Sequence, residues 1–176
     1  MMQAHESVNR VRETADAVVV ISNSNVLEMI PDDTSLEASF GLVDEVMGQA
    51  VFGLSNMITK TGILTAGFGD VNSVLQNSGL SVIGIGNGFG ESASEDATTS
   101  SLNSPLFDTP LHGARGILVN IVGGESLRTK HIDTVLQTTY ANVNKDANVK
   151  AAAQVDNSFL SDAVFVTVLC SQDSNH

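Results

Sequence analysis

One long amphipathic segment constrains the fold of this chain more than any other feature. Between residues 36 and 58, apolar side chains recur at spacings of three and four, which places them on one face of an α-helix. These residues are Leu36, Phe40, Val43, Met47, Val51, Leu54 and Ile58. At 1.5 Å per residue such a helix spans roughly 35 Å, about the width of a small domain. We therefore expect a central spine helix rather than a surface helix.

Local signals predict the ends of this helix and the element before it. Thr34 and Glu37 fit a T-x-x-E capping box, in which each side chain satisfies a backbone amide of the first turn. Lys60 and Gly62 fit a cationic last turn and a glycine just past the helix end. The run 17–21 (AVVVI) is continuously apolar and β-branched, which predicts a strand buried on both faces of an α/β sheet.

The chain after residue 70 alternates between helix and strand patterns. Helix patterns occur at 71–76, 91–102 and 127–140. Strand patterns occur at 80–86, 116–122, 148–155 and 163–169. The stretch 91–101 is rich in Ser, Thr and Asp, which compete with helix formation, so a frayed helix and a loop both fit it. The predicted fold is an α/β sandwich: a long N-terminal spine helix plus a four-stranded sheet with packed helices.

Four alternating glycines follow the first of these strand patterns and invite comparison with a phosphate-binding loop. They are Gly84, Gly86, Gly88 and Gly90. Their spacing does not match G-x-G-x-x-G, and no basic residue stands nearby. We therefore predict a flexible turn that permits positive φ.

Charge and composition exclude several classes of function. With 8 basic and 20 acidic residues, the net charge of −12 repels nucleic acids and anionic membrane surfaces, so we expect neither nucleic-acid nor direct membrane binding. Cys170 is the only cysteine, which excludes an intrachain disulfide and fits a reducing cytoplasm. We expect no metal site, because the histidines are scattered: His5, His112, His131 and His176.

Phe40 and Asp44 lie one turn apart on the predicted spine helix and allow two interpretations. A phenyl ring can stack on a purine, and a carboxylate one turn away can accept the N1 and N2 hydrogens that guanine presents. Alternatively, Phe40 is a core residue and Asp44 a solvated acid favoured by the helix dipole. Spacing alone leaves both interpretations open.

Longer blocks of the sequence resemble a known family. The series DAVVVISNSNVLEMI, LEASFGLVDEVMGQAVFGLSNMIT, GILTAGFGDVNSVLQNSG and GARGILVNIVGGESL is similar, in this order, to the C-terminal part of FtsZ, the tubulin-like cell-division GTPase. The resemblance covers nearly all of 16–172. It implies that 62–172 form the family's activation domain, with a chorismate-mutase-like fold.

The resemblance also implies roles for individual residues. It places Asn23, Phe40 and Asp44 at the guanine contacts of the family. It places residues 62–70 at the loop that each filament subunit inserts into its neighbour's nucleotide site, where the family pattern is N-x-D-x-x-D. Here these positions read Thr65, Gly67 and Asp70, so only the last acid is present. Asp70 has a second interpretation, as an acid at the N-terminus of the following helix.

The family's glycine-rich phosphate loop has no counterpart in this sequence. The resemblance therefore implies that GTP or GDP binds only together with an FtsZ-type N-terminal domain, with Mg²⁺ in the assembled site. We expect 1–15 to be a polar segment, 16–61 to form the junction with that domain and 173–176 to be a tail. The implied partners are that domain and neighbouring subunits of a filament.

Two hypotheses about function follow. The first is part of a polymerising cell-division GTPase, which supplies guanine contacts and the loop that stimulates hydrolysis in a neighbour. The second is a degenerate, non-catalytic paralogue that acts as a polymer-interaction or scaffold protein, which Thr65 and Gly67 favour. In either case the strand 17–21 and the helix stripe would lack their partner domain. We therefore expect the isolated chain to dimerise, aggregate or repack 17–21.

Overall fold

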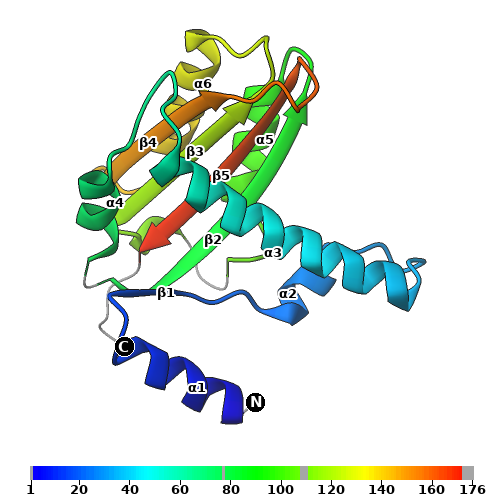
Figure 1. Cartoon of the computed structure of the whole chain (residues 1–176), viewed down its shortest axis with the longest axis vertical. Helices are drawn as coiled ribbons and strands as arrows, with labels where there is room; N and C mark the ends of the chain where they lie inside the picture. Colours follow the sequence, from blue (N-terminus) through cyan, green and yellow to red (C-terminus); the bar gives the residue numbers. More distant parts are fainter. Residues whose placement is uncertain (1, 77, 108–110, 172–176) are drawn as a thin grey trace.

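The computed structural model describes residues 2–76, 78–107 and 111–171, and the expected tail at 173–176 lies outside this part of the chain. A mixed sheet of five strands forms its centre (Figure 1), in the order β1-β2-β5-β3-β4. The strands are β1 (Ala17–Val19), β2 (Gly79–Phe89), β3 (Gly116–Gly123), β4 (Asn148–Val155) and β5 (Ala163–Ser171). β2 and β3 both run antiparallel to β5, while the outer pairs β1·β2 and β3·β4 are parallel.

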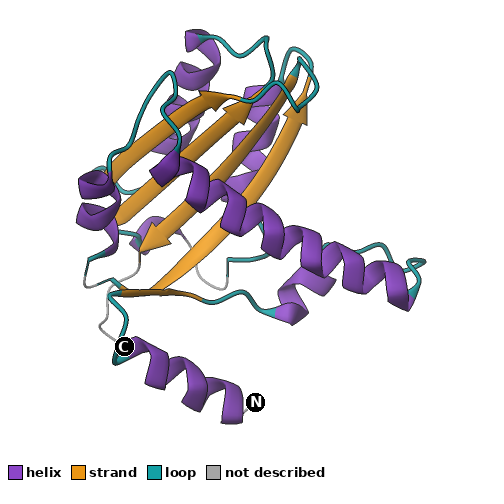
Figure 2. Cartoon of the chain, viewed as in Figure 1, coloured by secondary structure: helices purple, strands orange, loops and turns teal. Residues whose placement is uncertain are grey.

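Helices cover both faces of this sheet (Figure 2). The helices are α1 (Met2–Arg12), α2 (Asn23–Leu27), α3 (Leu36–Thr59), α4 (Phe68–Leu75), α5 (Ala93–Leu102) and α6 (Thr129–Asn142), with a short 3₁₀ turn, η1, at Leu111–Gly113. Of these, α1 lies beyond β1 and covers neither face (Figure 1). Side chains alternate along β3: Ile117 belongs to the core cluster beneath α5 and α6, and Leu118 to the cluster beneath α3 and α4. Because strand side chains have a period of two, this alternation gives the sheet two separate apolar cores.

The structure confirms the four strand patterns predicted after residue 79 and adds a fifth strand. The fifth is β1, which pairs with β2 over three residues, from Ala17 with Gly79 to Val19 with Ser81. The prediction of a strand buried on both faces at 17–21 is wrong. β1 lies at the edge of the sheet in the described chain, and its side chains are only half-buried.

The turn predicted at the alternating glycines is also wrong, apart from its last residue. Gly84, Gly86 and Gly88 lie inside β2, and only Gly90, just after the strand, has positive φ (75°). A Cβ on Gly86 would lie 2.0 Å from the Ala97 carbonyl oxygen of α5. The glycines are therefore required for close packing, since they let the backbone of α5 rest directly on β2. This support, together with buried α5 residues, explains why the polar stretch forms a helix.

The predicted ends of the spine helix need correction. The residue that caps the start of α3 is Ser35, whose hydroxyl accepts the Ala38 amide at 3.3 Å, so the box predicted at Thr34 lies one residue too early. The helix ends at Thr59, and Lys60 follows in extended conformation, so no left-handed glycine terminates it. Gly62 is instead needed because a Cβ there would lie 2.1 Å from the Ala153 carbonyl oxygen.

The glycine contacts yield a test of the packing of α5 on β2. Gly86→Ala should lower the free energy of unfolding by about 1–3 kcal/mol, because the new methyl overlaps the α5 backbone. Gly48→Ala is the matched control: no atom lies within 4 Å of its Cβ position, mid-helix in α3, so stability should rise by about 0.5–1 kcal/mol. Urea unfolding of both variants measures the difference, and equal stabilities would contradict the packing argument.

Candidate functional site

In the C-terminal half of α3, the helix backbone packs closely against a side chain of the sheet. A Cβ on Gly53 would lie 2.5 Å from the Thr167 hydroxyl oxygen of β5, so the helix touches the sheet directly at this point. Ala50 and Met57, on the same face of the helix, are buried in the core. In Figure 1 the N-terminal half of α3 extends beyond the sheet and runs beside α2. One end of the helix is therefore anchored, and the other projects.

A second apolar stripe of α3 is exposed beside the buried one. Most of the residues predicted to form a single stripe are in fact between 42% and 76% exposed: Leu36, Phe40, Met47, Val51 and Ile58. Only Val43 and Leu54 of the predicted stripe are partly buried against the core. The spine helix thus has two adjoining apolar faces, of which its own sheet covers one. An exposed stripe of this length is typical of an interaction surface.

Phe40 and Asp44 lie on the projecting half of α3. Within this chain Phe40 is 66% exposed and lies outside the core, and Asp44 is exposed one turn further along. Asn23 is the first residue of α2, the short helix that packs beside α3. All three predicted contacts therefore lie on the α2 and α3 elements.

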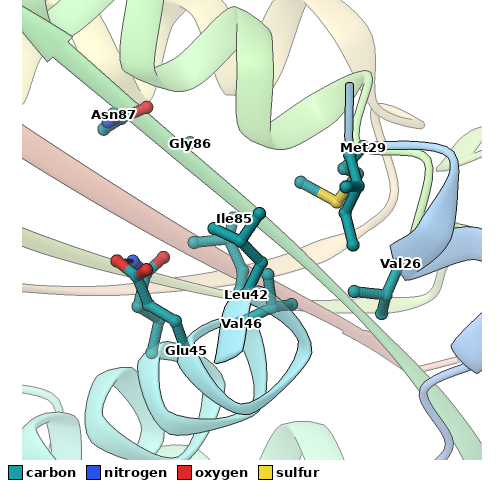
Figure 3. Close-up of a pocket in the computed structure, with 10 residues that line it drawn as sticks. Val26, Met29, Leu42, Glu45, Val46, Ile85, Gly86 and Asn87 are labelled. Atoms are coloured by element: carbon teal, nitrogen blue, oxygen red, sulfur yellow. Dashed lines mark hydrogen bonds between the residues drawn. The ribbon is translucent and has the colours of Figure 1, made fainter. Parts of the chain in front are cut away.

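A cavity of about 230 Å³ lies between α2, α3 and β2, and sequence reasoning did not find it. Figure 3 shows Leu42 and Val46 of α3 beside Ile85 of β2, with Met29, which follows α2, across the opening. At its rim the Gln49 amide donates a hydrogen bond to the Glu45 carboxylate at 3.2 Å. No lining residue is basic, so the cavity has no cation with which to hold a phosphate.

The segment between α3 and α4 lies along the outer edge of β4. The Leu64 amide donates to the Ala153 carbonyl at 3.1 Å, and the Ala153 amide donates back at 2.8 Å. At the start of the segment, Lys60 forms an ion pair with Asp156 at 3.2 Å. This loop, residues 60–67, is therefore attached to its own strand rather than free in solution.

Asp70 forms the second attachment of this segment. Its Oδ2 accepts the Gly67 amide at 3.0 Å, and its Oδ1 pairs with Lys150 of β4 at 3.2 Å. The Gly67 hydrogen bond and the Lys150 charge both lower the pKa of this carboxyl. The interpretation of Asp70 as an acid at a helix N-terminus is confirmed in geometry, since it lies in the first turn of α4. A catalytic role remains a proposal.

These contacts enclose a pocket of about 290 Å³ between the loop, α6 and β4. Its polar lining comes from Thr65, Asp70, Tyr140 and Lys150. Gly67 is exposed at the loop and has ordinary extended backbone (φ −73°, ψ 164°). Over the described residues, no three His, Cys, Asp or Glu side chains come together as a metal site. No described helix is long and apolar enough to cross a bilayer.

Comparison with known proteins identifies the family. Residues 79–172 match the model of the FtsZ family, C-terminal domain. The chain belongs to the FtsZ family. It is 35% identical over 156 residues to cell division protein FtsZ 1 of Methanocaldococcus jannaschii, and 33% identical over 153 residues to that of Archaeoglobus fulgidus. These alignments cover 89% and 87% of this chain but only 43% and 41% of the relatives, so the chain spans less than half of their length.

Solved structures agree with this assignment. An empty FtsZ dimer from M. jannaschii superimposes with a TM-score of 0.88 at 34% identity, covering 94% of this chain and 48% of the other. CetZ2 from Haloferax volcanii, solved as a GTPγS-bound protofilament, matches with a TM-score of 0.69 at 17% identity, covering 97% of this chain and 50% of the other. At this identity, the similarity to CetZ2 shows only a shared fold. The long α3 and mixed sheet of this chain are thus the arrangement of FtsZ-type C-terminal domains.

The ion pair at the start of the loop predicts a pH effect on stability. Hydrogen bonds from the Ser158 hydroxyl and amide, and then Lys60, lower the pKa of Asp156 to about 2. A depressed carboxyl pKa stabilises the fold above its ordinary value near 4, and this stabilisation is lost as the pH falls towards 2. Asp156→Asn should therefore cost about 1 kcal/mol at neutral pH and flatten the pH dependence between 4 and 2. Urea titrations against Asp133→Asn, an exposed carboxylate of α6, provide the control, and equal pH profiles would contradict the assignment.

The exposed stripe of α3 predicts self-association of the isolated chain. Sedimentation velocity should show dimers or larger species, which Val51→Lys combined with Ile58→Lys returns to monomer by placing two charges on the stripe. Val11→Lys combined with Leu160→Lys changes the charge equally at apolar residues that are 50% and 68% exposed elsewhere, and should leave association intact. A stable monomer of the unmodified chain would refute the prediction.

Proposed function

We propose that this chain is the C-terminal part of an FtsZ-type GTPase that assembles into filaments in the cytoplasm and acts in cell division. In this proposal it supplies one side of a guanine pocket and a loop that meets the nucleotide of a neighbouring subunit. The observation that carries it is the exposed apolar stripe of α3 in a chain of the FtsZ family. The relatives, more than twice as long, are named as cell division proteins.

The residues present suit the base of a guanine nucleotide. The exposed Phe40 ring offers a face for stacking, and the Asp44 carboxylate can accept the two hydrogens at N1 and N2. Asn23, the first residue of α2, is the third proposed contact. The base would therefore bind at the projecting end of α3.

The phosphates of the nucleotide would be held elsewhere. The glycine-rich stretch of β2 has no room for a ligand, because α5 covers it in backbone contact. The cavity between α2, α3 and β2 has no basic lining residue. We infer that an FtsZ-type N-terminal domain covers the α3 stripe and provides the phosphate loop, and that Mg²⁺ enters with the phosphates.

The loop before α4 is suited to contact with a second subunit. Ile63 of the loop and Phe68, the first residue of α4, are 54% and 72% exposed, so this region presents apolar side chains to solvent. The backbone pairing of Leu64 with Ala153 of β4 keeps this surface in one shape, which lowers the entropic cost of docking. Asp70 is the one acid that such a loop would bring to the neighbour's nucleotide.

A non-catalytic, filament-binding or scaffold function is the second candidate. Hydrolysis of a phosphate needs a group that orients and polarises water. Thr65 has no carboxylate, Gly67 has no side chain, and both Asp70 oxygens are engaged within the chain. These observations favour slow hydrolysis. They do not argue against binding of the guanine base.

Restoring the acid at residue 67 distinguishes the two functions. The Gly67→Asp side chain fits, since its Cβ would lie 3.7 Å from Asp70 Oδ2 on unstrained backbone. We expect this chain, joined to the N-terminal part of M. jannaschii FtsZ 1, to assemble with GTP and hydrolyse it slowly. Gly67→Asp should then raise the GTPase rate roughly 10²- to 10⁴-fold.

Gly69→Asp is the matched control, because it adds the same charge to the first turn of α4 where nothing lies within 4 Å. It should leave the rate near that of the unmodified fusion. Rapid hydrolysis without any substitution would rule out the non-catalytic candidate. A fusion in which Asp44→Ala leaves GTP affinity unchanged would refute the guanine contact.

A further inference from the structure

Lys150 introduces a cation at the loop that the proposed function brings to a neighbouring subunit. It lies on β4, and its ammonium group is 3.2 Å from Asp70 Oδ1. Both side chains remain partly exposed, Lys150 by 38% and Asp70 by 41%. The pair therefore lies at the surface of the loop pocket rather than in the core, where a ligand from another molecule can reach it.

The polar groups of this pocket are those of a phosphate-binding site. An ammonium group carries three donor hydrogens, and the contact with Asp70 uses one direction only. Thr65 accepts the Gly62 amide at its hydroxyl oxygen, which leaves the hydroxyl hydrogen to donate. The Tyr140 hydroxyl is a further donor in the lining. Because both Asp70 oxygens are already paired within the chain, the groups left to bind a ligand are these donors, which suits an anion better than activation of water.

The positive charge of Lys150 offsets two sources of repulsion towards an anionic ligand. The chain carries a net charge of −12, so its approach to an anionic ligand is unfavourable at long range. A bare Asp70 carboxylate would add repulsion at the point of contact. Lys150 neutralises that carboxylate and offers a positive charge to the same ligand.

We propose that Lys150 is a phosphate-binding residue, whose ammonium group contacts the terminal phosphate of the nucleotide held by a neighbouring subunit. The contact strengthens assembly and does not accelerate hydrolysis. This inference rests on the proposed function, because Asp70 and Lys150 meet a nucleotide only if the loop docks on a second subunit. It names the ligand chemistry of that same loop: a terminal phosphate of a nucleoside triphosphate.

The loop contains a matched control for this role. Lys60 forms an ion pair of the same length, 3.2 Å, with Asp156, the residue that follows β4. It does not line the pocket. A purely structural role for the ion pairs would give Lys60 and Lys150 similar importance for assembly.

The test uses the fusion to the M. jannaschii N-terminal part and measures the critical concentration for assembly by sedimentation, with GTPγS or GDP. Lys150→Met should raise the critical concentration about five- to tenfold with GTPγS and less than twofold with GDP, which lacks the terminal phosphate. Lys150→Arg should restore assembly. High salt should reduce the effect of Lys150→Met, because it screens exposed charges. Hydrolysis per assembled subunit should not change.

Several results would overturn the inference. An equal rise with GTPγS and GDP, or the same rise with Lys60→Met, would show that Lys150 only stabilises the loop. An unchanged critical concentration for Lys150→Met in an assembling fusion would exclude the phosphate contact while leaving the proposed function intact. If the unmodified fusion fails to assemble with GTPγS, the proposed function fails and the inference fails with it.

Discussion

The close contact between the backbone of Gly53 in α3 and the side chain of Thr167 in β5 is the constraint on which the remaining structure depends. It lies in the C-terminal half of a 24-residue helix, where the buried residues of that helix are found. The buried face of the helix then completes one of the two cores, with Ala50 and Met57. Because the helix is anchored at one end, its N-terminal half and its second apolar face project beyond the domain.

The same anchoring sets the geometry of the loop. α3 ends beside β4, where Lys60 meets Asp156, and the following residues run along the edge of that strand. Pairing of Leu64 with Ala153 covers part of an edge that would otherwise be open to other strands. The loop is therefore ordered by its own domain before any partner arrives. Because α3 and the loop are both attached to the same sheet, the proposed base-binding end of α3 and the loop are held in fixed positions relative to each other.

Much of the fold could be predicted because the hydrophobic periods were clear. The strands after residue 79 and the long helix follow from periods of two and 3.6 residues. The glycines of β2 could not be interpreted in this way. A glycine signals backbone freedom in one setting and close packing in another, and only the position of α5 distinguishes the two for Gly86. The polar segment 93–102 forms a helix, α5, because its backbone packs on these glycines.

The candidate site shows a similar division. The sequence by itself determined the family, the helix that carries Phe40 and Asp44, and the absence of acids at Thr65 and Gly67, since these depend on residue identity and local spacing. Only the tertiary structure decided which face of α3 is covered, because two adjoining apolar stripes have the same helical period. It alone brought Lys150 to Asp70, since an ion pair between residues 80 positions apart is set by how β4 lies against the loop, not by any pattern in the chain.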